Sequence, residues 1–120
     1  MAKVLIIEDD PDVRALEHMA LQCSGHEVST AVNGCDGYER LVSEAPCIVL
    51  LDLMMPVMDG LAFLKKRREN GVALDVPVVC VTAGGPDLVA RARALGATGC
   101  VEKPAGVEEL CTIVREYCGA

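Results

Sequence analysis

Residues 50–60 read LLDLMMPVMDG and join an apolar stretch to a loop that contains proline and glycine. Together with Ile48 and Val49, this stretch places a single acid, Asp52, among apolar side chains. A short apolar run that ends at turn residues is typical of a strand buried on both faces. An unpaired charge is costly to bury, so Asp52 must either be compensated by a cation or take part in chemistry.

The composition sets limits on the class of protein. A chain of 120 residues fits one domain, residues 1–120, with enough apolar side chains (52%) for a core. The net charge of −7 argues against broad contact with nucleic acid or an anionic membrane. Neither a membrane-spanning run nor a signal peptide is visible, so we expect a cytoplasmic protein. The basic run at 65–68 is expected to form the last turn of a helix, where cations complement the helix dipole before a capping Gly71.

Cysteine is abundant, and the seven cysteines occur at positions 23, 35, 47, 80, 100, 111 and 118. They form no C-x-x-C pair, and the only histidines are His18 and His26. We therefore predict reduced thiols, mostly in the core, rather than disulfides or a zinc site.

Strand-like and helix-like segments alternate along the chain. Apolar runs predict strands at 4–7, 47–51 and 76–81, with weaker candidates at 28–32 and 99–102. Helical spacing marks the segments between and after them; the first stripe consists of Val13, Leu16, Ala20 and Cys23. Asp10 and Pro11 are expected to cap that helix. Five strands that alternate with five helices predict a parallel sheet with helices on both faces.

Polar residues follow the carboxyl ends of these strands, where open parallel sheets place their sites. Glu8 and Asp9 follow the first strand, Asp52 the third, Thr82 ends the fourth and Lys103 follows the fifth. If the first and third strands are neighbours, three carboxylates share one crevice and repel one another unless a cation intervenes. Mg²⁺ suits such oxygen ligands, and the site would then receive a phosphoryl group with Asp52 as nucleophile. Taken singly, Thr82 and Lys103 would be interpreted as structural residues; their joint placement favours a site.

Four stretches resemble the response regulator receiver domain of two-component signalling: VLIIEDDPDVR (4–14), VLLDLMMPVMDG (49–60), VPVVCVTA (76–83) and VEKP (101–104). The resemblance covers the whole chain in order. It implies an α/β, flavodoxin-like (βα)5 fold, with a doubly wound parallel five-stranded sheet in the order 2-1-3-4-5.

The resemblance also implies a role for each polar residue of the crevice. Asp52 matches the phosphoacceptor, and Asp9 matches a direct Mg²⁺ ligand, with Glu8 acting through water. The Met54 backbone carbonyl matches a further metal ligand, and Thr82, Ala83 and Lys103 match the residues that contact the phosphoryl group. The Lys103–Pro104 bond matches a step that is commonly cis. Pro56 and Gly60 match the turn after the phosphoacceptor.

Three positions depart from the family pattern. Cys100 stands where an aromatic switch residue is usual, and Ala105 where phenylalanine is common. Gly84-Gly85-Pro86 makes the loop after Thr82 rich in glycine. The residues for the chemistry are present, whereas the coupling of Thr82 to an aromatic side chain is not expected here.

The expected function is a phosphorylation switch rather than an enzyme with external substrates. A histidine kinase or histidine phosphotransfer protein would phosphorylate Asp52, and the surface of the last two helices and last strand would then act on a downstream effector. The alternative is a receiver-like interaction module that works without phosphorylation. A phosphohydrolase of the haloacid dehalogenase type is disfavoured, because position 54 is methionine rather than a second acid. From Met1 and Ala120 we expect a stand-alone receiver or one taken from a longer regulator.

Overall fold

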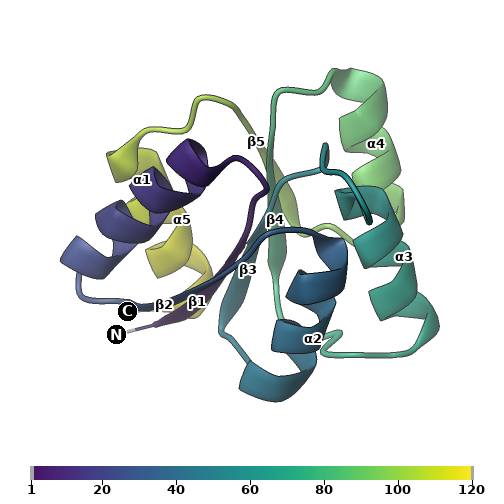
Figure 1. The fold of residues 1–120 in the computed structure, drawn as a ribbon, viewed down its shortest axis with the longest axis horizontal. Helices are drawn as coiled ribbons and strands as arrows, with labels where there is room; N and C mark the ends of the chain where they lie inside the picture. Colours follow the sequence, from purple (N-terminus) through teal and green to yellow (C-terminus); the bar gives the residue numbers. More distant parts are fainter. Residues whose placement is uncertain (1, 120) are drawn as a thin grey trace.

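The computed structural model describes residues 2–119 as five strands and five helices that alternate along the chain (Figure 1). Met1 and Ala120, on which the expectation about a longer regulator depended, lie outside the described residues. The elements are β1 (Lys3–Ile7), α1 (Pro11–Cys23), β2 (Glu27–Ala31), α2 (Gly34–Glu44), β3 (Ile48–Leu51), α3 (Gly60–Glu69), β4 (Val78–Thr82), α4 (Pro86–Ala94), β5 (Gly99–Glu102) and α5 (Val107–Cys118).

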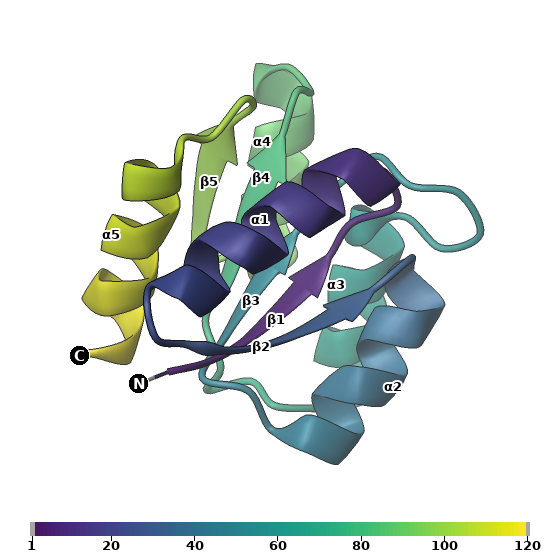
Figure 2. The ribbon, with the colours of Figure 1, turned by 60° about the vertical axis from the view of Figure 1, so that its left-hand side comes forward.

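The strands form one parallel sheet in the order β2-β1-β3-β4-β5, as the family resemblance implied. Helices α1 and α5 cover one face, and α2, α3 and α4 cover the other (Figure 1). Figure 2 shows α1 crossing in front of the strands, with α5 beside it. The predicted architecture is confirmed.

Each face of the sheet packs against its own hydrophobic cluster. Successive residues of a strand point to opposite faces, so Leu5 and Ile7 join the cluster under α2, α3 and α4. Val4 and Ile6 join the cluster under α1 and α5. Burial on both faces explains why β1, β3 and β4 are apolar at consecutive positions.

Helix α1 begins as predicted but buries a different face. The Asp10 side chain accepts hydrogen bonds from the backbone N–H groups of Asp12 and Val13, and Pro11 is the first helical residue. The predicted stripe is partly wrong, since Leu16 (64% exposed) and Cys23 point outward. The buried residues are Glu17, Ala20 and Leu21, because α1 contacts both the sheet and α5 and these contacts set its rotation.

The basic run at the end of α3 is not uniformly solvated. Arg67 is buried (3% exposed), and its Nη2 donates hydrogen bonds to the backbone carbonyls of Ala73, Leu74 and Val76. Burial lowers the pKa of Arg67. The predicted basic last turn is confirmed, and its buried member Arg67 also holds the α3–β4 connection in place.

The cysteine prediction also needs correction. Cys47, just before β3, forms a disulfide with Cys118 at the end of α5. Of the free cysteines, only Cys80 is buried; Cys100 and Cys111 are partly buried, and Cys23 and Cys35 are exposed. Folding brings Cys47 and Cys118 together across a separation of 71 residues, which local sequence spacing does not reveal.

None of the helices described between residues 2 and 119 combines the length and hydropathy needed to cross a membrane.

Candidate functional site

Three carboxylates meet at the carboxyl edge of the sheet. Glu8 and Asp9 follow β1, and Asp52 follows β3. The two strands are neighbours, with Ile7 paired to Leu51, so the three acids lie at the same level. One carboxylate oxygen from each lies within 4.8 Å of the other two, which is close enough for a shared metal ion.

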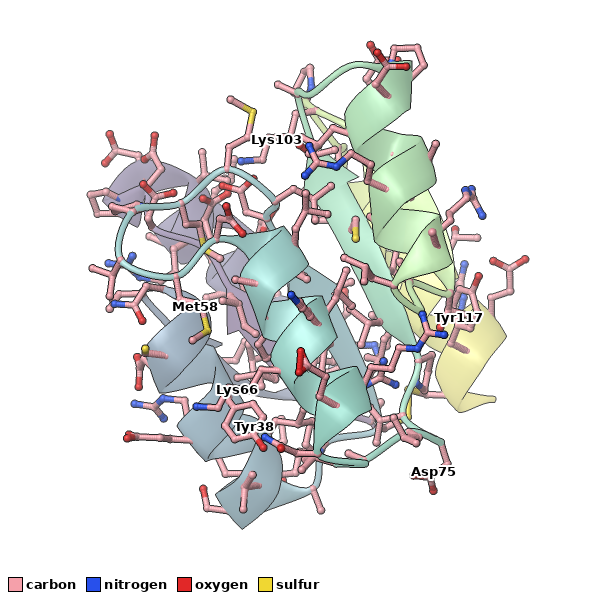
Figure 3. The ribbon with its side chains drawn as sticks, turned by 90° about the vertical axis from the view of Figure 1, so that its right-hand side faces the viewer. Tyr38, Met58, Lys66, Asp75, Lys103 and Tyr117 are labelled. Atoms are coloured by element: carbon pink, nitrogen blue, oxygen red, sulfur yellow. A yellow bond between two sulfur atoms is a disulfide. The ribbon has the colours of Figure 1, made fainter. Side chains whose placement is uncertain are left out.

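Lys103, which comes directly after β5, joins this acidic group at the same edge of the sheet. Its Nζ lies 2.5 Å from Oε1 of Glu8 and 3.5 Å from Oδ2 of Asp52. Figure 3 shows Lys103 beside the loop that leads into α3. The cation therefore offsets part of the charge of two acids that are almost fully buried.

The electrostatics of Glu8 and Lys103 reflect this arrangement. Burial raises the pKa of Glu8 to about 7; Lys103 partly offsets this effect and nearby Asp52 adds to it. Burial acts to lower the pKa of Lys103, but the hydrogen bond to Glu8 and the negative charge of Asp52 outweigh it, so the net change is upward. Lys103 is thus held in its charged form beside Glu8 and Asp52.

Thr82 ends β4 and is buried at the same edge of the sheet. Its Oγ1 accepts a hydrogen bond from the N–H of Gly84, and its carbonyl accepts one from the N–H of Lys103. The second bond ties the β5–α5 loop to the end of β4. Ala83, the next residue, is exposed. The peptide bond between Lys103 and Pro104 is cis, as the resemblance implied.

The loop after Asp52 is held closely against the start of α3. The N–H of Met54 donates to Oδ1 of Asp52 at 3.2 Å, which places the Met54 backbone beside the carboxylate. The N–H of Gly60 donates to the carbonyl of Leu53. A Cβ at Gly60 would lie 2.6 Å from the carbonyl oxygen of Asp52, so only glycine permits this approach. The predicted turn residue Gly60 thus fixes the position of the acid.

Cys100 lies on β5, opposite Cys80 of β4. It lines an open pocket of about 500 Å³ together with Thr82, Gly84 and Arg93. The small side chain at this position and the neighbouring glycine leave room beside the buried threonine.

Sequence reasoning missed Glu17, which is 7% exposed. Its carboxyl has neither a hydrogen bond nor an ion pair with the residues between 2 and 119, and burial raises its pKa to about 7. Glu17 lines a pocket of about 250 Å³ between α1 and α5, together with Lys103 and Leu16. Glu17 lies three residues before Ala20 and four before Leu21, which is the spacing of one helix face and could have indicated its burial. Because Glu17 is charged, we did not include it in the buried face.

Comparison with known proteins gives a consistent result. The family described as response regulator receiver domain matches residues 4–115. The DNA-binding dual master transcriptional regulator RpaA of Synechocystis is 35% identical over 96% of this chain and 48% of its own length. The sporulation initiation phosphotransferase F of Bacillus subtilis is 30% identical over 96% of this chain and 92% of its own.

Solved structures agree with the sequence comparison. The chemotaxis protein CheY4 of Vibrio cholerae superposes with a TM-score of 0.90 at 30% identity, and 98% of each chain is covered. The chain spans about half the length of several curated relatives, RpaA among them.

Proposed function

The chain belongs to the family of response regulator receiver domains of two-component signalling, and we propose that Asp52 is its phosphoacceptor. The observation that carries this proposal is the convergence of Glu8, Asp9 and Asp52 within 4.8 Å, with Lys103 Nζ 3.5 Å from the Asp52 carboxylate. Residues 1–120 would then form a single receiver domain.

The donor set fits Mg²⁺, the ion that this family typically binds. Carboxylates of Glu8, Asp9 and Asp52 offer hard oxygen atoms, and the Met54 carbonyl would be a further, backbone ligand. Asp9 would be a direct ligand, and Glu8, which contacts Lys103, would act through water. Bound Mg²⁺ would supply positive charge beside the phosphoryl oxygens.

The remaining roles belong to side chains and backbone groups around Asp52. An Asp52 carboxylate oxygen forms a bond to phosphorus while the P–N bond of a phosphohistidine donor breaks. The leaving imidazole nitrogen keeps the electron pair and takes a proton from water. Lys103, already close to Asp52, would pair with a phosphoryl oxygen, and Thr82 and the Ala83 N–H would donate to the others.

The partners follow from this chemistry. The donor would be a histidine kinase or a histidine phosphotransfer protein in the cytoplasm. The product would shift the surface of α4, β5 and α5 toward a state that a downstream effector domain or protein recognises. The domain would catalyse only its own phosphorylation and dephosphorylation, and would contact neither nucleic acid nor membrane directly.

The test is labelling with acetyl phosphate and Mg²⁺, followed by intact mass. The wild type should gain one phosphoryl group, and Asp52→Asn should gain none. Asp12→Asn, which changes an exposed acid on α1, is the matched control and should label normally. Labelling of Asp52→Asn, or an unlabelled wild type, would contradict the proposal.

A second candidate function is an interaction module that works without phosphorylation. The open pocket at Cys100, beside the buried Thr82, favours it because no aromatic side chain at that position can follow the threonine. Failure of the protein to take up beryllofluoride in the presence of Mg²⁺ would support this candidate over the first.

A further inference from the structure

The disulfide lies at the edge of the sheet opposite the carboxylates. Cys47 comes directly before β3, whose other end leads to Asp52. Cys118 ends α5, and the loop before α5 carries Lys103. Figure 2 shows the end of α5 beside the starts of the strands. The bond therefore joins the far ends of the two segments that deliver Asp52 and Lys103 to the site.

We propose that Cys47 and Cys118 form a second modification site, a reversible disulfide that is made and broken by exchange with glutathione. Both residues are partly buried rather than enclosed, so a small thiol can reach either sulfur. The other five cysteines remain thiols, two of them exposed. In the proposed cytoplasmic location a disulfide is more often transient than permanent.

The exchange balances as two thiol–disulfide steps. The Cys47 thiolate attacks one sulfur of glutathione disulfide, which forms a mixed disulfide and releases one glutathione. The Cys118 thiol then attacks the Cys47 sulfur, loses its proton to solvent and releases the second glutathione. We assign the first attack to Cys47, because the negative end of the α5 dipole disfavours a thiolate at Cys118, the last residue of the helix.

Oxidation restrains α5 without changing the acidic site. The closed loop contains Asp52, Thr82 and Lys103, but the bond itself touches none of them. Leu110, Ile113 and Val114 attach α5 to the sheet, and the last turn beyond them gains the covalent link to the start of β3. The disulfide should therefore suppress local opening of this turn, which belongs to the surface proposed to contact the effector.

The first test counts thiols. The wild type is equilibrated without oxygen in glutathione buffers of rising disulfide fraction, quenched with acid, alkylated and weighed. We expect one transition from seven alkylated cysteines to five, and a linked 47–118 peptide. Cys111→Ser should keep the transition, whereas Cys47→Ser and Cys118→Ser should lose it. No transition across the whole series, or a link between other cysteines, would overturn the proposal.

The second test measures hydrogen exchange of the wild type in its oxidised and reduced forms. It needs no substituted protein, so misfolding of a variant cannot affect the result. Amides at the end of α5 should exchange about tenfold more slowly when oxidised, while those of α2 stay unchanged. Equal exchange of α5 in both forms would overturn the regulatory role. Labelling of Asp52 by acetyl phosphate is measured alongside and should reach the same extent in both forms, so failure of the redox site is distinguishable from failure of the phosphoacceptor assignment.

Discussion

Replacement of Glu17 by glutamine should remove a large part of the pH dependence of stability. Burial raises the pKa of Glu17 from 4.5 to about 7; Lys103 lowers this pKa by a smaller amount and Asp52 raises it by a smaller amount. Between these values the folded protein keeps a proton that the unfolded chain has released. The free energy of unfolding therefore falls as the pH rises through this interval.

The magnitude follows from the two pKa values. At 1.36 kcal/mol per pKa unit, the whole interval corresponds to about 3 kcal/mol, most of which is lost between pH 5 and pH 8. Glu17 is 7% exposed, so solvent screens this cost only weakly. Glutamine does not titrate, so this part of the loss should disappear in Glu17→Gln.

The assay is urea unfolding of the wild type and Glu17→Gln at pH 5 and pH 8. Glu8 also has a pKa raised to about 7, so some pH dependence should remain in both proteins, and the difference between them isolates Glu17. Glu39→Gln, which changes an exposed glutamate on α2, should behave like the wild type. An equal change between pH 5 and pH 8 in the wild type and Glu17→Gln would refute the reasoning.

Three further substitutions test other parts of the structure. Arg67→Met should lower the free energy of unfolding by about 3 kcal/mol in urea, since three backbone carbonyls lose their donor; Lys65→Met on the same helix is exposed and should have little effect. Val57→Gly should raise the free energy of unfolding by about 1 kcal/mol, because it removes the backbone strain of φ +68° at a side chain that is 82% exposed. A lower free energy of unfolding for Val57→Gly would contradict this strain. Gly60→Ala should cost about 2 kcal/mol and slow acetyl phosphate labelling, because its Cβ would press on the Asp52 carbonyl; normal stability and labelling would show that the loop can yield.

The grouping of the polar residues at the carboxyl edge of the sheet could be predicted from the sequence. Strands buried on both faces are visible as apolar runs, and the polar residues that follow them share one edge. The helix cap at Asp10 could also be predicted, because the residues that indicate it are adjacent in the sequence. The strand order was not derivable from periodicity and came from the family resemblance.

The burial of charged residues could not be predicted in the same way. Glu17 and Arg67 lie on helices whose charged positions normally face solvent, and their burial depends on contacts with distant elements. The pairing of Cys47 with Cys118 likewise depends on where α5 ends relative to the start of β3. Each of these features is set by tertiary packing, which a pattern of neighbouring residues does not encode.

The separation of the interior into two clusters by the sheet has a consequence for how the molecule tolerates change. Phe63 lies on one side and Ile113 on the other, and neither cluster shares a buried member with its counterpart. The changes in free energy of unfolding caused by one substitution in each cluster should therefore add. Substitutions that repack the α5 side should therefore leave the contribution of the α2–α4 side to stability unchanged.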